Sequence, residues 1–462
     1  MSDTLKIISP IDQSIVAERP VATAQQINTV LTNAQQAQRQ WQQISISERA
    51  RLCHQAIDEF VAQADEISKE ITLQMGRPLQ HTPGEVAGVE ERARYMIDIA
   101  EQELMDIPVE ERPGFQRFIR QQALGVVLCI VPWNYPYLTA INAIIPALMS
   151  GNSVILKHST QTLLCAERLF QVFEKVGLPA GVFQYLHLNH ALTTALVQNT
   201  AIAYVTFTGS NAGGITIEQA LAGHFKPVTF ELGGKDPAYV LPDADLAFAV
   251  ANLVDGAFFN SGQSCCAIER IYVHENVYDA FVEQFVHLVK QYRVGNPFDE
   301  NTSLGPVVSK KRAEFIRAQI KQAESLGATA CINEGDFAVA GLSETFLAPQ
   351  VLLNVDHSMA VMKDETFGPV IGIMKVRNDQ EAVQLMNDSR YGLTASFWTQ
   401  DTDKAILLGD QINTGTVFMN RCDYLDPALA WIGVKQSGRG CSLSRLAYKH
   451  FTRPKSFHLR KL

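Results

Sequence analysis

The sequence predicts an α/β protein with open, mostly parallel sheets that are covered by helices on both faces. Short apolar runs rich in β-branched residues alternate with segments of helical periodicity, which is the pattern of repeated strand–helix–strand units. The chain has 462 residues, of which 47% are hydrophobic and only 19% are charged. The chain can therefore bury a large core, and its length predicts two or more domains.

The first hundred residues are predicted to be mostly helical. Thr23 with Gln26, and Ser45 with Glu48, have the spacing of capping boxes, and each pair is followed by apolar residues at helical intervals. Two surface helices are therefore expected to begin at these positions.

The next part of the chain is predicted to form a first parallel sheet. Its candidate strands lie at residues 125–131, 153–156, 182–188, 203–207 and 228–231. Most of the spacers are long enough for crossover helices, for example at residues 163–176. Open sheets of this kind bind ligands at the carboxyl ends of their strands, so a site is expected there.

A second α/β block is predicted from about residue 233 to residue 430. Its expected helices and strands include residues 246–257, 277–292, 270–273 and 370–376. The polar segment at residues 105–122 predicts a β-hairpin. Residues 454–460 alternate like an edge strand, which is expected to pair outside its own domain.

Charge and hydropathy argue against nucleic acid and membrane as partners. The 48 acidic and 39 basic residues give a net charge of -9, and no block of basic residues forms a nucleic-acid footprint. The longest apolar stretch, residues 137–149, is interrupted by Asn142 and Pro146 and is too short to span a bilayer. It therefore predicts a buried helix.

The cysteines and the N-terminal residues indicate a cytoplasmic protein. The 8 cysteines have neither metal-ligand spacing nor the pattern of a disulfide framework, so no metal site is expected. The first residues lack the basic segment and the apolar core of a secretory signal. A reducing cytoplasm would keep a thiol available for chemistry.

Two short segments suggest a nucleophile and a base. Cys265 follows a Gly-Gln turn, and Glu231 precedes a Gly-Gly turn. A thiolate can attack a carbonyl carbon, and a carboxylate with a pKa near neutral can activate the water that releases the covalent intermediate. A single cysteine is more often a small buried hydrophobe, so the hypothesis depends on the two residues together.

Seven motifs follow one another along nearly the whole chain. They lie at residues 132–136 (Pro-Trp-Asn-Tyr-Pro), 151–157 (Gly-Asn-Ser-Val-Ile-Leu-Lys), 207–210 (Phe-Thr-Gly-Ser), 231–235 (Glu-Leu-Gly-Gly-Lys), 262–265 (Gly-Gln-Ser-Cys), 365–369 (Glu-Thr-Phe-Gly-Pro) and 437–440 (Ser-Gly-Arg-Gly). In kind and order they resemble the motifs of the NAD(P)-dependent aldehyde dehydrogenase superfamily.

The resemblance implies an aldehyde dehydrogenase-like α/β fold with a Rossmann-like cofactor-binding domain, an α/β catalytic domain and a β oligomerisation arm. We expect residues 1–104 and 123–232 to form the cofactor-binding domain and residues 233–430 to form the catalytic domain. Residues 105–122 and 431–462 would form the arm and the C-terminal segment. Arms of the family join subunits, so a homodimer or homotetramer is expected.

The resemblance also implies roles in catalysis. Cys265 stands at the nucleophile position, Glu231 at the general-base position and Asn134 at the position of the oxyanion donor. The Cys265 thiolate would attack an aldehyde, and the Asn134 side chain with the backbone N–H of Cys265 would stabilise the oxyanion. After hydride transfer to NAD or NADP, Glu231 would activate water to hydrolyse the thioester. The expected substrate is thus a small-molecule aldehyde and the product a carboxylic acid.

Cofactor contacts are implied in the same way. Lys157 matches a lysine that binds the adenosine ribose, and Glu365 matches the residue that holds the nicotinamide ribose. Ser210 is expected at a helix N-terminus, where the helix dipole favours a pyrophosphate. The full set of expected cofactor-binding residues is Trp133, Lys157, Thr160, Gly209, Ser210, Gly214, Leu232, Glu365 and Phe367.

One departure from the family pattern concerns the choice of cofactor. The family commonly has a glutamate where Thr160 stands, and that glutamate repels the 2′-phosphate of NADP. Without this charge both NAD and NADP are expected to be usable. His158 is a second candidate for contact with the phosphate, although a lone histidine is more often structural.

A second departure concerns the substrate. Succinic semialdehyde enzymes of the family usually carry an arginine eight residues after the oxyanion asparagine, where Asn142 stands in this chain. This favours a substrate without a carboxylate, with Arg421 as a possible replacement for the missing charge. The expected pocket residues are Tyr135, Asn142, Arg421, Tyr424 and Trp431, which would suit aliphatic, aromatic or amino-aldehydes.

Three alternatives stay open at this point. One is a succinic semialdehyde dehydrogenase with a non-standard carboxylate site. Another is a CoA-acylating relative that passes the thioester to a thiol, although Glu231 argues against it. The third is a cysteine hydrolase or a cofactor-free binding protein, although no histidine stands in an evident partnership with Cys265.

Overall fold

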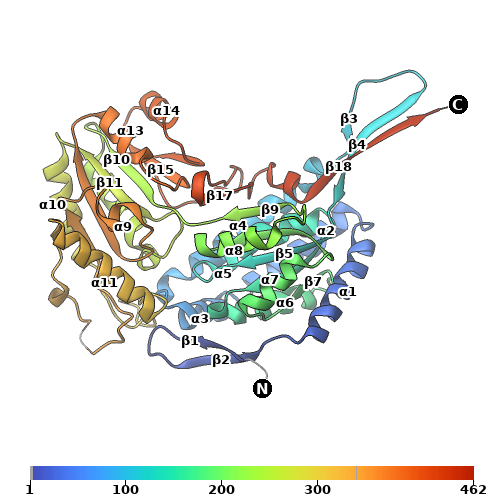
Figure 1. Cartoon of the computed structure of the whole chain (residues 1–462), viewed down its shortest axis with the longest axis horizontal. Coiled ribbons are helices and arrows are strands. Elements are labelled where there is room, and N and C mark those ends of the chain that lie inside the picture. Colours follow the sequence, from blue (N-terminus) through green and yellow to red (C-terminus); the bar gives the residue numbers. More distant parts are fainter. Residues whose placement is uncertain (1–3, 340, 462) are drawn as a thin grey trace.

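The computed structural model describes residues 4–339 and 341–461 and contains two α/β lobes and a projecting β arm (Figure 1). One lobe is built on a six-stranded sheet and the other on a seven-stranded sheet. Both sheets are mainly parallel, so the predicted α/β class is confirmed.

The six-stranded sheet contains all five strands predicted for the first block. In spatial order its strands are β17 (Gly438–Arg439), β9 (Val228–Glu231), β8 (Ile202–Thr208), β5 (Val126–Val131), β6 (Ser153–His158) and β7 (Phe183–Tyr185). All neighbours are parallel except β17, which pairs antiparallel with β9. A piece of the C-terminal segment therefore completes the edge of this sheet next to Glu231.

Helices cover both faces of this sheet because apolar side chains alternate along its central strand. Val127 and Cys129 of β5 face a core shared with one group of helices, whereas Val126 and Leu128 face the other group. The first group is α2 (Ile46–Val61), α3 (Ala64–Met75), α4 (Pro83–Glu103), α5 (Pro136–Met149) and α6 (Leu163–Lys175); the second is α1 (Ala24–Trp41), α7 (His190–Gln198) and α8 (Asn211–Leu221).

The seven-stranded sheet has the same two-sided construction. In spatial order its strands are β12 (Thr329–Ala330), β13 (Gln350–Leu353), β14 (Val370–Val376), β11 (Ile268–His274), β10 (Asp236–Val240), β15 (Thr394–Trp398) and β16 (Thr416–Met419). Helices α9 (Leu246–Phe258) and α10 (Tyr278–Val289) cover one face. The other face packs against α11 (Lys310–Ser325), α12 (Ala360–Lys363), α13 (Asp379–Asn387) and α14 (Thr402–Gly409).

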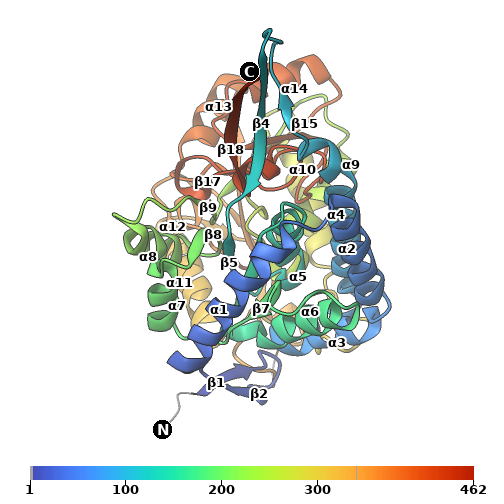
Figure 2. The ribbon, with the colours of Figure 1, turned by 90° about the vertical axis from the view of Figure 1, so that its right-hand side faces the viewer.

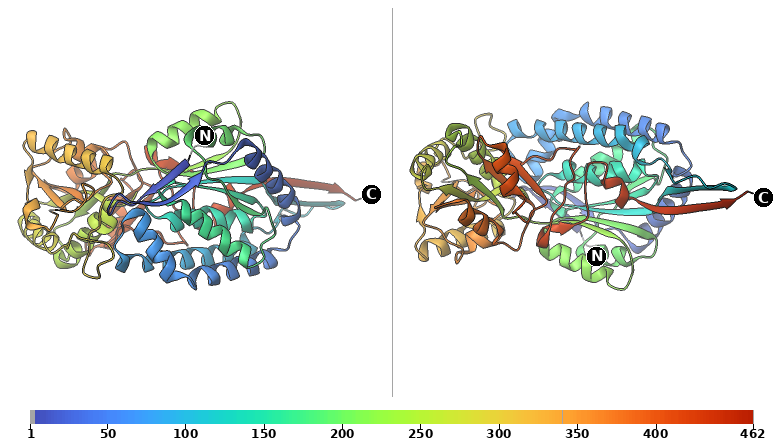
Figure 3. Two further views of the ribbon diagram at one scale, coloured as in Figure 1. Left: turned by 90° about the horizontal axis from the view of Figure 1, so that it is seen from below. Right: turned by 90° about the horizontal axis from the view of Figure 1, so that it is seen from above.

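The arm is an antiparallel sheet of three strands, β18 (Thr452–Arg460), β4 (Phe115–Ala123) and β3 (Ile107–Pro108). The predicted hairpin and the predicted C-terminal strand are both present, and they pair with each other. The stacked rings of Phe118 and Phe457, whose centroids are 4.6 Å apart, occupy directly paired positions. Figures 2 and 3 show the arm extending away from both lobes, with the C-terminus near its tip.

The N-terminal region differs in two respects from the prediction. A two-stranded ladder, β1 (Thr4–Ile8) with β2 (Ile15–Pro20), precedes the helices and was not predicted, because β2 is largely exposed and lacks a buried face. Thr23 forms the complete capping box of α1. Ser45 caps α2, but Glu48 pairs with Arg51 instead of closing the box.

The apolar stretch at residues 137–149 lies in the buried helix α5, as predicted. Helix α5 packs against α4, and the carboxyl end of β5 leads directly into the turn before it. In the part of the chain that the structure describes, no helix has the length and apolar character needed to cross a bilayer.

Candidate active site

Cys265 follows an unusual backbone turn at the end of α9. Asn260, Ser261 and Gly262 are successive residues in the left-handed region, with φ of 53°, 57° and 69°. A Cβ atom at position 262 would lie 2.3 Å from the carbonyl oxygen of Gly368, so only glycine fits there. The turn brings the half-buried Cys265 to the wall of a cavity of about 720 Å³.

Asn134 lies in the turn between β5 and α5 and faces the nucleophile loop. Its side-chain Nδ2 donates to the carbonyl oxygen of Gln263 at 3.1 Å. Gln263 is itself buried and accepts a hydrogen bond from the backbone of Val308 at 2.8 Å. The Asn134 amide is therefore held beside Cys265, with one of its two N–H bonds used by Gln263.

A buried ion pair holds the turn between β5 and α5 in place. Arg77 and Glu85 pair at 2.6 Å, and their side chains are 1% and 0% exposed. Arg77 also donates to the carbonyl oxygen of Asn134 and, at 3.2 Å, to the side chain of Asn260. Glu85 accepts from the backbone N–H of Tyr137 at 2.8 Å. The pair thus joins the turn that carries Asn134, the start of α5 and the turn before Cys265.

Glu231 ends β9 and lines the same cavity. Its carboxylate accepts a hydrogen bond from the Ser442 hydroxyl at 2.6 Å. Burial raises the pKa of Glu231 to about 7, because desolvation disfavours the charged form more than the Ser442 hydrogen bond stabilises it. This is the range in which a carboxylate can act as a general base at neutral pH.

Gly234, three residues after Glu231, packs directly on the backbone of Cys265. A Cβ atom at position 234 would lie 2.3 Å from the carbonyl oxygen of Cys265. The backbone of the β9–β10 connection therefore touches the backbone of Cys265, which places Glu231 and Cys265 on adjacent walls of the cavity.

Six of the nine residues predicted to bind the cofactor line the cavity. They are Trp133, Gly209, Ser210, Leu232, Glu365 and Phe367. Ser210 caps the eleven-residue helix α8 by accepting from the N–H of Gly213 at 3.2 Å. The rings of Trp133 and Phe367 meet edge to face, with centroids 5.6 Å apart. The N-terminus of α8 and a pair of aromatic rings are thus joined in one cavity.

The other three predicted cofactor residues do not line this cavity. Lys157 is buried at the end of β6, where burial lowers its pKa to about 8. Thr160 is half-buried in the short 3-10 turn after β6. Gly214 lies inside α8, where a Cβ atom would come within 2.8 Å of the Leu232 side chain. Gly214 therefore serves the close packing of α8 on Leu232.

His158 is held by structural contacts and does not face the cofactor side. Its Nε2 interacts with the carbonyl oxygen of Pro136 at 3.0 Å and its Nδ1 with the Thr162 hydroxyl at 2.9 Å. Burial lowers the pKa of His158 to about 3, so the ring is neutral. Both ring nitrogens are therefore occupied inside the fold, which favours the structural role of His158 over contact with a phosphate.

Glu365 lies against the base segment and is held by a second buried ion pair. The backbone N–H of Gly234 donates to Glu365 at 3.1 Å, and burial raises the pKa of Glu365 to about 7. Glu269 accepts from the backbone N–H groups of Thr366 and Phe367, both at 2.8 Å. Lys235 pairs with Glu269 at 2.6 Å, so β10, β11 and the Glu365 loop form one unit.

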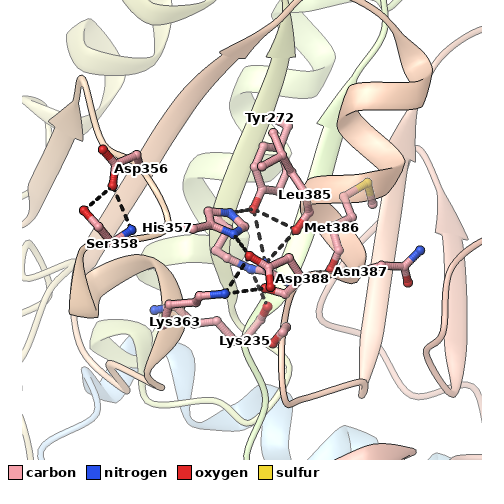
Figure 4. A network of polar contacts seen from close by, with 12 residues as sticks. Lys235, Tyr272, Asp356, His357, Ser358, Lys363, Leu385, Met386, Asn387 and Asp388 are labelled. Atoms are coloured by element: carbon pink, nitrogen blue, oxygen red, sulfur yellow. Dashed lines mark hydrogen bonds and ion pairs between the residues drawn. The ribbon is translucent and has the colours of Figure 1, made fainter.

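A further polar network supports Lys235 from the side of α13. Arg270 donates to the carbonyl oxygen of Lys235 at 2.9 Å and to that of Met386 at 3.1 Å. Asp388 accepts from His357 and from Lys363, both at 2.6 Å, and His357 also contacts the Tyr272 hydroxyl (Figure 4). The network anchors Lys235, which immediately precedes β10, and, through its pair with Glu269, the Glu365 loop.

Four of the five predicted substrate-pocket residues line the cavity: Tyr135, Asn142, Tyr424 and Trp431. Arg421 does not; it is exposed and lies over the Tyr424 ring at 3.6 Å from the ring centroid. Cys266 also lines the cavity, where its thiol donates to Asp423 at 2.9 Å.

Several cavity residues were missed by sequence reasoning. Glu91 and Arg92 come from α4, Asp255 comes from α9, and Ser442 comes from the C-terminal segment. No motif marks them, because their place in the site depends on helix packing between distant segments. The part of the chain that the structure describes holds no group of three or more potential metal ligands.

The Arg77–Glu85 pair gives a test of the site's construction. Replacing Arg77 with Met leaves Glu85 buried without its partner, so we expect a loss of about 3–5 kcal/mol in the free energy of unfolding. The control is Arg94→Met on the outer face of α4, whose ion pairs with Asp58 and Glu90 lie at the surface and are worth about 0.2–1 kcal/mol. Thermal unfolding of both variants measures the difference, and equal shifts would contradict the assigned importance of the pair.

Comparisons with known proteins agree with this geometry. The model of the aldehyde dehydrogenase family matches residues 1–457. The chain is 33% identical over 446 residues to "Succinate-semialdehyde dehydrogenase [NADP(+)] 1" of Mycobacterium tuberculosis, covering 96% of this chain and 97% of the relative.

Two solved structures show the same fold with cofactor. The crystal structure of succinic semialdehyde dehydrogenase from Streptococcus pyogenes in complex with NADP+ has a TM-score of 0.94 and 28% identity, covering 99% of this chain and 100% of the other. Betaine aldehyde dehydrogenase from Staphylococcus aureus in complex with NAD+ has a TM-score of 0.94 and 29% identity, covering 99% and 92%. This chain therefore belongs to the aldehyde dehydrogenase family and is an NAD(P)-dependent oxidoreductase that acts on aldehydes.

Proposed function

We propose that the protein oxidises an aldehyde to a carboxylic acid by covalent catalysis, with Cys265 as nucleophile, Asn134 as oxyanion donor and Glu231 as general base. The observation that carries this proposal is the convergence of the three side chains on one cavity that also contains the N-terminus of α8. Cys265 immediately follows the segment that the Asn134 amide holds, and Glu231, whose pKa is raised to about 7, lines the same cavity.

In the first step the Cys265 thiolate attacks the aldehyde carbon. The carbon–oxygen double bond opens, and the negative charge on the oxygen is stabilised by the free N–H of the Asn134 amide and by the backbone N–H of Cys265. The hydrogen bond from Asn134 to Gln263 supports this role, because it fixes the amide before substrate arrives.

The second half of the reaction needs a base. Once hydride has left, the acyl group is held on Cys265 as a thioester, and water must lose a proton to attack it. Glu231 takes that proton, and its pKa of about 7 allows it to be ionised when water enters and protonated afterwards. A dedicated base beside the thioester favours water over a thiol such as CoA as the acceptor.

The cavity residues fit a dinucleotide. When bound, NAD or NADP accepts the hydride at its nicotinamide ring. Ser210 and Gly209 at the N-terminus of α8 would hold the pyrophosphate, and Glu365 would accept hydrogen bonds from the ribose of the nicotinamide. Lys157 and Thr160 lie beyond the cavity, so they would meet only the adenosine end of the cofactor.

A cysteine hydrolase fits the cavity less well. Among the described residues no histidine lines it, so Cys265 has no imidazole base.

We also place the protein in the cytoplasm, because a thiolate nucleophile needs a reducing compartment.

The division into domains follows the two sheets. We propose that residues 1–104 and 123–232 bind the cofactor and that residues 233–430 form the catalytic domain. Residues 105–122 and 431–462 would supply the arm and the C-terminal segment, with β17 returning to the cofactor sheet.

The arm supports a homodimer or homotetramer. β18 is an edge strand of a sheet that extends from the body of the molecule, and it offers unpaired backbone groups to another chain. Ile107 and Leu459 of the arm are exposed apolar side chains that association would bury.

Replacing Cys265 with Ala tests the nucleophile. We expect kcat/KM for aldehyde oxidation to fall by at least about 1,000-fold, because the covalent route is lost. The affinity for NADP, measured by the quenching of tryptophan fluorescence, should stay largely unchanged. The control is Cys331→Ala, a cysteine remote from the cavity. Turnover retained by the Cys265 variant would refute the assignment.

Replacing Ser442 with Ala tests the base. Below pH 7 Glu231 is protonated and cannot activate water, so kcat at saturating substrates should rise with pH through a midpoint near 7 in the native protein. Loss of the Ser442 hydroxyl removes a donor to the carboxylate, so the pKa rises and the midpoint moves up by about one pH unit. Ser325→Ala, at the end of α11, should leave the midpoint in place. An unchanged midpoint in the Ser442 variant would remove this hydrogen bond from the account.

Charge introduced into the arm tests the assembly. The double variant Ile107→Asp with Leu459→Asp should have a lower molecular mass in light scattering after size exclusion, because burying two carboxylates in an interface is unfavourable. Leu326→Asp, an equally exposed position on the other lobe, serves as the control. If the arm variant keeps the native mass, association uses another surface.

A further inference from the structure

We propose that Arg92 binds a carboxylate at the far end of the substrate, so that the preferred substrates are aldehydes with a terminal carboxylate group. This inference rests on the function proposed above and identifies the class of aldehyde. The observation behind it is a buried guanidinium that lines the substrate side of the cavity and forms no ion pair with any described residue.

Arg92 lies on α4 and is 8% exposed. Among the described residues it forms no ion pair, and it donates a long hydrogen bond of 3.5 Å to the side-chain oxygen of Asn142. Burial lowers the pKa of Arg92, which shows how poorly its charge is solvated. An arginine still keeps its proton in a protein, so the charge is present; Glu85, Glu91 and Asp423 act on it only at longer range, without an ion pair.

The contrast with Arg77 shows what a structural arginine looks like in this fold. Arg77 is also buried, at 2% exposure, but it has Glu85 as a partner and two further acceptors, Asn134 and Asn260. Arg92 donates to no carboxylate and to no backbone carbonyl of the described residues, and the Asn142 side-chain oxygen accepts from it at 3.5 Å. Its free donors border the cavity instead, where a ligand can reach them.

The helices around Arg92 leave room for a substrate. Gly84, Ala87 and Gly88 form a small-residue face of α4 on the cavity wall. A Cβ atom at position 88 would lie 3.0 Å from the Leu138 side chain of α5, so the two helices approach closely there. Arg92, one turn further along α4, and Asn142, one turn after Leu138, close this part of the cavity together.

Arg92 and Asn142 form a suitable site for a carboxylate. The guanidinium offers a planar fork that matches the two oxygens of a carboxylate. Because the Asn142 oxygen faces Arg92, its NH₂ group remains as an additional donor. The Arg92 guanidinium reaches Asn142 from the neighbouring helix α4. It thus takes the place of the arginine that the sequence lacks at position 142.

Acidic residues near the cavity already have hydrogen-bond donors or lie at its rim. Asp423 accepts from the Ser264 hydroxyl and the Cys266 thiol, both at 2.9 Å. Glu91 is exposed and accepts from the Tyr424 hydroxyl at 2.8 Å, and Asp255 is exposed as well. These carboxylates would repel a doubly charged phosphate more strongly than a singly charged carboxylate, which favours the carboxylate.

The test compares two four-carbon aldehydes, succinic semialdehyde and butanal, by their kcat/KM values. The native protein should prefer succinic semialdehyde. In Arg92→Met this preference should fall by about 10–100-fold, mostly through KM, because one charge-assisted hydrogen-bonding group is lost. Butanal should be oxidised at nearly the native rate. Arg94→Met, two residues away on the outer face of α4, should keep the native preference.

Two further measurements separate recognition from a structural effect. The double variant Arg92→Met with Asn142→Arg returns a guanidinium to the same place from α5, so it should regain most of the preference. In the native protein succinate should inhibit butanal oxidation at constant ionic strength far better than butanoate does. The inhibition experiment does not depend on the folding of any variant.

Several outcomes would overturn the inference. They are equal kcat/KM values for both aldehydes in the native protein, equal losses for both in Arg92→Met, or a preference for glyceraldehyde 3-phosphate. A preference for 3-aminopropanal would instead assign substrate recognition to the acidic rim. In each of these cases aldehyde oxidation itself would stand. A native protein that binds NADP but oxidises none of these aldehydes would overturn both proposals.

Discussion

The structure of the site depends on close contacts between three backbone segments, at which a Cβ atom would have no room. The segment after Glu231 touches the carbonyl of Cys265 through Gly234, and the turn before Cys265 touches the carbonyl of Gly368 through Gly262. Glycine is required because a single added carbon would lie 2.3 Å from an oxygen at either contact. This packing brings base, nucleophile and cofactor loop to one cavity, although they come from β9, from the end of α9 and from the segment before β14.

Buried charges hold these segments in place. The Arg77–Glu85 pair joins the oxyanion turn to the nucleophile turn, and the Lys235–Glu269 pair joins the base segment to the Glu365 loop. Taking such charges out of water is costly, so a buried pair is retained only where its hydrogen bonds are well satisfied. Here the two ion pairs bind backbone N–H and C=O groups that have no partner in a sheet or helix. They therefore orient the segments that form the site.

The two ends of the cavity differ in the charged and polar groups that line them. The cofactor end combines the N-terminus of α8 with the carboxyl group of Glu365, which suits the phosphates and hydroxyls of a dinucleotide. The substrate end combines an acidic rim with the unpaired guanidinium of Arg92. Between them Glu231 has a raised pKa because its desolvation outweighs the hydrogen bonds from the Ser442 and Trp431 side chains. These groups therefore lie in a partly desolvated region, where electrostatic interactions are stronger than in bulk water.

The sequence by itself determined the α/β class, the main strands and helices, and the positions of Cys265, Glu231 and Asn134, because these depend on local periodicity and on short motifs. Only the tertiary structure decided what surrounds them. It excluded His158 and Arg421 from the cavity and brought in Arg92, Ser442 and Asp423. Arg92 and Asn142 are 50 residues apart and meet only because α4 packs on α5, which no local pattern encodes. Short motifs thus marked three residues of the cavity, whereas long-range packing placed the residues that surround them.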